Sequence, residues 1–135
     1  MNEIAVFVYG TLRKGGSNHF RMAGSDFVGE GTIEGSIYMI DWNPQLTYPA
    51  LVCGGEGRVK GEVYLVSEES LKALDEFEGI GVSSWRDDEY RRVEVKASLA
   101  DGTERLAWLW EWNLSLGTAR RLEDGDWLKY EPDPS

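Results

Sequence analysis

The chain opens with an apolar run that leads directly into a glycine-containing turn, in the stretch VFVYGTLRKGG from Val6 to Gly16. A run without polar alternation is typical of a strand buried on both faces, so this segment needs apolar partners above and below it. Gly10 ends the run and allows a tight turn and the close approach of a ligand. Successive backbone N–H groups after such a strand can bind an anion, with Arg13 and Lys14 nearby. A plain buried strand and loop would show the same pattern.

The charge balance restricts the classes of partner. The 135 residues include 14 Lys and Arg against 24 Asp and Glu, a formal net charge of −10. Nucleic acids and anionic membranes attract basic surfaces, so we expect neither as a partner. No apolar stretch has the length of a membrane span, and the N-terminus lacks a leader pattern. We therefore expect one cytoplasmic domain over residues 1–135, either a monomer or a homodimer.

The chain contains one cysteine, Cys53, and one histidine, His19. A lone cysteine cannot form an intramolecular disulfide, and there is no His/Cys cluster for a metal, so we expect no metal and no cofactor. A Cys–His catalytic pair is arithmetically possible. We instead interpret Cys53 as a structural residue and His19 as a residue of a loop or of a first helical turn.

Short strands interrupted by glycines make up most of the chain. After the opening strand we expect strands over residues 27–40, 50–52, 58–66, 89–99 and 104–112, and turns over 41–49 and 54–57. The glycines within the first of these strands predict bulges or bends, as a small barrel requires; they are Gly29, Gly31 and Gly35. Asp101 and Gly102 predict a hairpin. Residues 126–135 are expected to form a surface tail with a frayed end.

The clearest helix is expected from Glu68 to Glu78, with Ser67 as its N-cap and Gly79 directly after its end. Its apolar face is formed by Leu71, Leu74 and Phe77. At about 100° per residue, Glu78 falls within this apolar arc and Glu76 falls opposite it. We therefore expect Glu78 to face the protein, where burial would raise its pKa. The alternative is that the helix frays at Gly79 and that Glu78 reaches water.

Three tryptophans, Trp108, Trp110 and Trp112, occur at every second position of the last predicted strand, so they share one face. Such a stripe can form a platform for a ligand. More often, an aromatic stripe covers a core. If the three indoles were exposed in one patch, they would indicate an interaction protein instead.

Seven motifs, in this order, resemble the gamma-glutamylcyclotransferase-like family. They are YGTLR (residues 9–13), YPALV (48–52), VKGEVY (59–64), LKALDEFEG (71–79), EYRR (89–92), AWLW (107–110) and GDW (125–127). Each motif alone is short, but their shared order and spacing extend the resemblance over most of the chain. The resemblance implies an α+β fold, a small mixed β-barrel with a few packed helices.

The resemblance also implies a site. The loop after the first strand would hold the gamma-glutamyl group through its backbone; its residues are Tyr9, Gly10, Thr11 and Leu12. Glu78 occupies the position of the family's catalytic glutamate, and Tyr90 that of a tyrosine that helps to bind substrate. Trp110 stands where relatives commonly have tyrosine, and an indole N–H donates but cannot accept a hydrogen bond. Arg13 is expected as a partner for a substrate carboxylate.

The implied reaction releases 5-oxoproline and a free amine or amino acid from a small gamma-glutamyl amide. Glu78 would take a proton from the substrate's α-amino group and deliver it to the departing amine. Some members of the family lack an acid at this position, so its presence favours an enzyme. The alternative is a non-catalytic binding module for a gamma-glutamyl compound or another small carboxylate metabolite.

Overall fold

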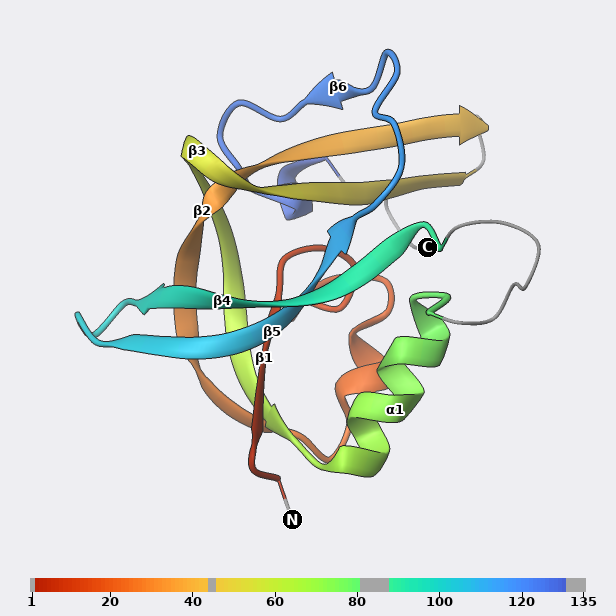
Figure 1. Ribbon diagram of the computed structural model, residues 1–135. Coiled ribbons are helices and arrows are strands. Elements are labelled where there is room, and N and C mark those ends of the chain that lie inside the picture. Colours follow the sequence, from red (N-terminus) through yellow and green to blue (C-terminus); the bar gives the residue numbers. More distant parts are fainter. Residues whose placement is uncertain (1, 44–45, 81–87, 131–135) are drawn as a thin grey trace.

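The strands form a closed barrel. The computed structural model describes residues 2–43, 46–80 and 88–130. In these residues five strands follow one another in the order β3-β1-β5-β4-β2, and β2 pairs back onto β3 (Figure 1). The sheet is mixed because β1 runs parallel to β5, whereas the other neighbours are antiparallel. The predicted fold, a small mixed barrel with packed helices, is confirmed.

The strands and helices have the following bounds. The barrel strands are β1 (Ile4–Val8), β2 (Asp26–Asn43), β3 (Leu46–Val66), β4 (Tyr90–Leu99) and β5 (Glu104–Trp112), and a short β6 (Arg120–Arg121) adds to β2. The α-helix α1 (Glu68–Phe77) is accompanied by two 3₁₀ helices, η1 (His19–Met22) and η2 (Trp127–Lys129). None of the helices within the described residues is long and apolar enough to cross a lipid bilayer.

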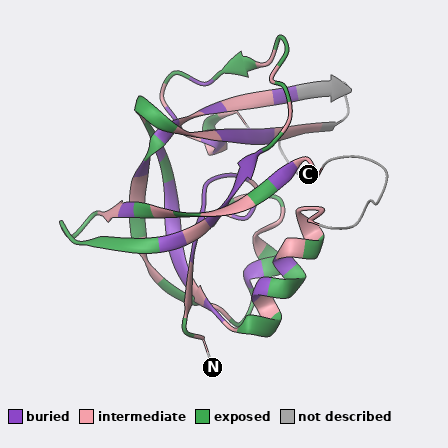
Figure 2. Ribbon diagram, viewed as in Figure 1, coloured by how far each residue is buried: buried purple, intermediate pink, exposed green. Residues whose placement is uncertain are grey.

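The strand β1 is buried on both faces, as its unbroken apolar run predicts (Figure 2). Phe7 points into a cluster to which all five strands contribute, and this cluster fills the barrel. Val6 and Val8 point the other way, into a second cluster that includes Leu71 and Leu74 of α1. The helix therefore covers the outer side of β1, and β1 runs between two hydrophobic cores.

The hairpin of β2 and β3 is longer than the sequence predicts. β2 continues to Asn43 and β3 begins at Leu46, so the connection expected over 41–49 is shorter than predicted. β3 runs through the turn expected over 54–57, so that prediction is wrong. The ladder passes from the pair Gly35–Cys53 to the pair Glu34–Arg58, so residues 54–57 form an irregularity within β3 instead of a separating turn. Glycine is still required there, since Gly54 has a φ of 92°. The predicted bulges occur at Gly29 and Gly35.

The C-terminal segment differs from the expected surface tail. Trp127 has no exposed surface and lies in the barrel cluster together with Leu122. Its burial reflects the large apolar area of an indole, which closes one end of the barrel. Residues 131–135, predicted to fray, lie outside the described residues, as does Trp85.

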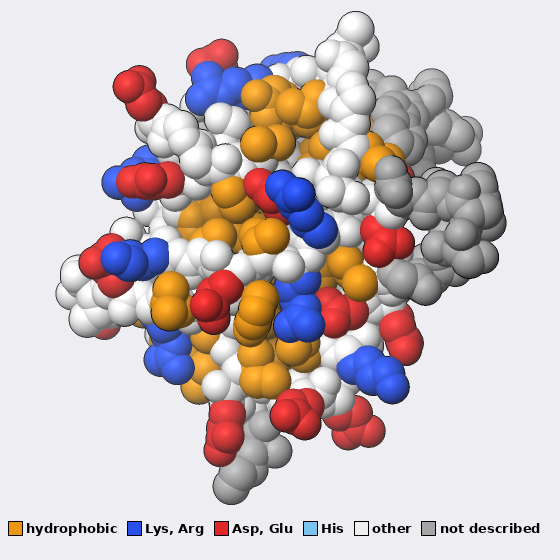
Figure 3. All heavy atoms as spheres, viewed as in Figure 1, with side chains coloured by type: hydrophobic (Ala, Val, Ile, Leu, Met, Phe, Trp, Pro, Cys, Tyr) orange, Lys and Arg blue, Asp and Glu red, His pale blue; other side chains and the backbone are white. Residues whose placement is uncertain are grey.

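The tryptophan stripe of β5 is part of the core. Trp110 and Trp112 are 2% and 4% exposed, and Trp108 packs against the same cluster. The face of the molecule shown in Figure 3 carries several groups of hydrophobic side chains, each bordered by charged ones. The structure therefore contradicts an interaction surface made of these three indoles and confirms the prediction that the aromatic stripe covers a core.

The helix α1 follows its sequence pattern closely. The Ser67 side chain accepts a hydrogen bond from the backbone N–H of Ser70, as an N-cap does. Glu78 is the C-cap, and Gly79 follows with a φ of 82°. Glu76 is exposed, whereas Glu78 faces a cavity, as the helical phase predicts.

Gly61 provides a test of the barrel packing. A Cβ atom at this position would lie 2.2 Å from the carbonyl oxygen of Val8 and 2.6 Å from Cζ of Phe7. Gly61→Ala should therefore lower the free energy of unfolding by about 1–3 kcal/mol in denaturant titrations. Gly29→Ala is the matched control, since a Cβ there meets nothing within 4 Å, and it should stay within about 0.5 kcal/mol of wild type. Equal effects of the two substitutions would contradict this packing.

Candidate active site

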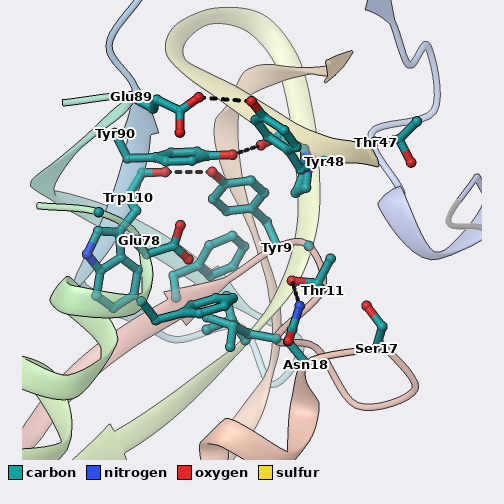
Figure 4. A pocket seen from close by; sticks show the side chains of 17 residues that line it. Tyr9, Thr11, Ser17, Asn18, Thr47, Tyr48, Glu78, Glu89, Tyr90 and Trp110 are labelled. Carbon is teal, nitrogen blue, oxygen red and sulfur yellow. Dashed lines mark hydrogen bonds between the residues drawn. The ribbon is translucent and has the colours of Figure 1, made fainter. Parts of the chain in front are cut away.

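A cavity of about 530 Å³ opens where β1 ends (Figure 4). It lies between the loop after β1, the outer arm of β3, the end of α1 and the adjoining ends of β4 and β5. Of the residues predicted for the site, those that line this cavity are Tyr9, Gly10, Thr11, Leu12, Glu78, Tyr90 and Trp110. The fold thus brings together residues from both halves of the chain.

The carboxyl group of Glu78 is the most perturbed acid of the site. In Figure 4 it lies between the side chains of Trp110 and Tyr9 and points into the cavity. Among the described residues no side chain donates a hydrogen bond to it. Burial raises its pKa to about 8, against the opposing charge of Arg21 and with a further contribution from Asp75. Near neutral pH this carboxyl group can therefore both accept and donate a proton.

Tyrosine hydroxyls hold the walls of the cavity in place. Tyr9 donates a hydrogen bond to the Trp110 carbonyl oxygen at 2.5 Å, and Tyr90 donates to the Pro49 carbonyl oxygen at 2.5 Å. Burial raises the pKa of both hydroxyls well above their ordinary value, so both remain protonated. Each oxygen keeps a lone pair that can accept a hydrogen bond from a ligand. At the rim, Tyr48 donates to the Glu89 carboxylate at 2.9 Å.

The loop after β1 is ordered by its own hydrogen bonds. The backbone N–H of Arg13 donates to the Gly10 carbonyl oxygen at 3.0 Å. The backbone N–H of Asn18 donates to the Thr11 carbonyl oxygen, and the Asn18 side-chain amide donates to the Thr11 hydroxyl oxygen. Within the described part of the chain, the backbone N–H groups of Thr11 and Leu12 have no backbone acceptor. These two N–H groups are available to an anion or an oxyanion.

The absence of a side chain at Gly10 allows close packing against Pro49, in addition to the expected tight turn. A Cβ atom there would lie 2.3 Å from Cγ of Pro49, so a side chain would push the arm of β3 away from the loop. The close approach that the glycine permits in the structure is that of Pro49.

Arg13 is a correction to the sequence analysis. Its side chain does not line the cavity; it donates to Glu62 at 2.5 Å and to Asp126 at 2.9 Å, and it is 11% exposed. Two carboxylates therefore already neutralise this guanidinium, and the expected contact with a substrate carboxylate is not supported. Its role is to tie the loop to β3 and to the C-terminal segment.

Trp110 lines the cavity. Its indole N–H donates to Oδ1 of Asp75 at 2.9 Å, so the indole N–H, its one polar group, is engaged by the helix. The indole N–H is therefore not free to make a polar contact with a ligand.

Several lining residues were missed by the sequence analysis, among them Asn18, Thr47, Tyr48, Pro49 and Glu89. The motifs YPALV and EYRR contain three of them, but composition gives no reason to assign them to a pocket. Thr47, Tyr48 and Pro49 line the cavity because they lie on the long β2–β3 arm, whereas Asn18 directly precedes η1 and Glu89 directly precedes β4.

Cys53 and His19 stay outside the cavity. Burial and the nearby Glu111 raise the pKa of the Cys53 thiol to about 12, so it is a poor nucleophile, as expected of a structural cysteine. His19 begins η1, and its Nδ1 lies 2.9 Å from the Leu12 carbonyl oxygen. Among the described residues no group of three or more His, Cys, Asp and Glu is arranged to hold a metal ion.

Comparison with known proteins identifies relatives along nearly the whole chain. The model of a family described as gamma-glutamyl cyclotransferase, AIG2-like, matches residues 6–129. A protein of Pyrococcus horikoshii, provisionally named a gamma-glutamylcyclotransferase, is 35% identical over 124 residues, covering 92% of this chain and 90% of its own. A protein of Niallia circulans named gamma-L-glutamyl-butirosin B gamma-glutamyl cyclotransferase is 33% identical over 126 residues, covering 93% of this chain and 76% of its own.

The fold agrees with these relatives. The crystal structure of the Pyrococcus horikoshii protein superposes with a TM-score of 0.69 and 34% identity, covering 94% of this chain and 92% of that one. The mouse AIG2-like protein superposes with a TM-score of 0.67 and 26% identity, covering 82% of this chain and 78% of that one. The match of the family model, the relatives and the shared barrel establish that this chain belongs to the gamma-glutamyl cyclotransferase, AIG2-like family.

Proposed function

We propose that the chain catalyses the cyclisation of a gamma-glutamyl amide. The α-amino nitrogen of the glutamyl group attacks its own γ-carbonyl carbon, the amide C–N bond breaks, and 5-oxoproline and a free amine are released. The observation that carries this proposal is the Glu78 carboxyl group, which burial gives a pKa of about 8. It shares one cavity with Thr11 and Leu12, whose backbone N–H groups have no backbone acceptor among the described residues.

Proton transfer gives Glu78 its proposed role. The substrate's α-amino group is protonated near neutral pH and must lose a proton before it can attack. Charged Glu78 accepts this proton and then donates it to the departing amine, while the second proton that the ring nitrogen loses on closure passes to solvent, so the carboxyl group returns to its starting state. A pKa near 8 suits both steps, because neither protonation state is strongly favoured.

The cavity wall would supply positioning and charge stabilisation. Ring closure is intramolecular, so the largest gain comes from holding the glutamyl chain folded. The N–H groups of Thr11 and Leu12 are the proposed donors to the substrate's carboxylate or to the oxyanion that forms at the γ-carbon. The Tyr90 oxygen, whose proton is engaged by Pro49, is a proposed acceptor for the α-amino group.

The charge of the cavity favours one class of leaving group. Among the described lining residues the charged side chains are Glu78 and Glu89, and none is Lys or Arg. A leaving amino acid would bring its own carboxylate towards these acids, and none of the described lining residues offers a cation to it. We therefore propose a gamma-glutamyl amine, not a gamma-glutamyl amino acid, as the preferred substrate. The name of the Niallia circulans relative supports gamma-glutamyl compounds as the substrate class.

The central residue can be tested by Glu78→Gln, which removes the proton-transfer group and nearly preserves its shape. With gamma-glutamyl n-butylamide as substrate, release of 5-oxoproline should fall at least about a hundredfold. Glu76→Gln is the matched control on the same helix: its side chain is exposed, and it should keep wild-type turnover.

The fold of Glu78→Gln is checked by its stability. Burial favours the neutral form of Glu78, so its contribution to stability is full below about pH 4.5 and is lost as the pH rises through about 8. At pH 8 the neutral glutamine should therefore leave the variant at least as stable as wild type. A folded Glu78→Gln variant with wild-type turnover would refute the proton-transfer role. If wild type binds the amide but never converts it, the pocket serves as a binding module.

The pH dependence of the reaction should report the same group. Because charged Glu78 is the base, kcat/KM should fall about tenfold per pH unit below about pH 8 and level off above it. The residual kcat/KM of Glu78→Gln should not show this decrease at low pH. An acid limb centred near pH 4.5 in wild type would mean that the reacting carboxyl group is not the buried one.

A further inference from the structure

The last turn of α1 is attached to the barrel through one carboxylate. Oδ1 of Asp75 accepts a hydrogen bond from the indole N–H of Trp110 at 2.9 Å and forms an ion pair with Nε of Arg92, 3.2 Å away. Arg92 and Trp110 lie directly opposite each other on β4 and β5. Asp75 therefore binds a cross-strand pair, and the Arg92 guanidinium also lies over the Trp108 ring at 4.7 Å.

This attachment is one turn away from Glu78. Asp75 and Glu78 are three residues apart, which places them on neighbouring positions of one helical face. The helix stops at Glu78, and the backbone leaves through Gly79, with the Ile80 amide donating to the Asp75 carbonyl at 2.9 Å. Helix ends fray unless side chains or packing hold them, so the position of Glu78 depends on contacts such as this one.

We propose that Asp75 is a positioning residue that fixes the final turn of α1 against the Arg92–Trp110 pair and so holds the Glu78 carboxyl group in the cavity. The inference rests on the proposed function of Glu78 and deepens it. It also assigns a structural role to the tryptophan at position 110 of this chain. An indole N–H can only donate, and it supplies the donor that the Asp75 acceptor requires.

Asp75 has an electrostatic effect that a purely structural residue would not have. The charges that act on Glu78 are the Asp75 carboxylate on the same helix and the Arg21 guanidinium of η1. The hydroxyls of Tyr9 and Tyr90 also face Glu78, whose charge raises their pKa values, so both stay neutral. Asp75 raises the pKa of Glu78 and Arg21 lowers it. Removing the charge of Asp75 should therefore make the Glu78 carboxyl group more acidic, while Arg21 is unchanged.

The test uses two substitutions that separate position from charge. Asp75→Asn keeps an oxygen that can accept from Trp110 but loses the charge, whereas Asp75→Ala loses both. Glu76→Gln is the matched control, since it removes an exposed charge that lies two residues before Glu78 in the sequence. The measurements are the NMR titration of Glu78 in protein labelled at glutamate Cδ, and kcat at pH 9.5, where Glu78 is charged in every variant.

In Asp75→Asn the titration midpoint of Glu78 should fall by about one pH unit, while kcat at pH 9.5 stays within about threefold of wild type. In Asp75→Ala, kcat should fall at least about tenfold because the carboxyl group is no longer held in place. Glu76→Gln should move the midpoint by less than about 0.3 unit, because solvent screens its charge.

Two results would overturn the proposal: an unchanged Glu78 midpoint in Asp75→Asn, or wild-type kcat in Asp75→Ala. The titration of the nearly isosteric Asp75→Asn decides the question even if Asp75→Ala does not fold. A different result would show that the proposed function itself is wrong. In that case wild type would release no 5-oxoproline, while the titration would still report whether Asp75 acts on Glu78.

Discussion

The burial of β1 on both faces is the constraint on which the rest of the structure depends. Phe7 needs a barrel on one side, and Val6 and Val8 need a helix on the other. Both layers must therefore enclose the same strand, and α1 has to lie beside its end. The loop that leaves β1 then emerges between the two layers, where the end of α1 and the arm of β3 also meet. The cavity follows from this arrangement.

The site combines fixed walls with an acid whose pKa is raised by burial, Glu78. The hydroxyls of Tyr9 and Tyr90 donate to backbone carbonyls, and Arg13 is neutralised by Glu62 and Asp126, so these groups define the geometry of the cavity. Burial disfavours the charged form of Glu78 and raises its pKa. Such a group is costly in the native state and suited to proton transfer, which is why buried, perturbed acids indicate function.

Local patterns predicted much of this structure. The apolar run of β1, the Asp101-Gly102 hairpin and the inward phase of Glu78 each depend on nearest neighbours or on one helical period. Long-range contacts were missed. Nothing local shows that Arg13 meets Glu62 and Asp126. The same holds for the continuation of β3 through residues 54–57 and for the packing of Trp127 in the barrel cluster. The barrel itself was predicted from a resemblance, since periodicity does not specify which strands pair.

The central claim is that the glutamyl group's own amine, and not water, is the nucleophile. The most direct measurement is mass spectrometry of the products formed from gamma-glutamyl n-butylamide in water enriched in ¹⁸O. Our account predicts 5-oxoproline without ¹⁸O and an equal amount of butylamine, because no water oxygen enters the product. Glutamate that carries ¹⁸O in its γ-carboxyl group would contradict the account, because water would then have attacked the γ-carbon.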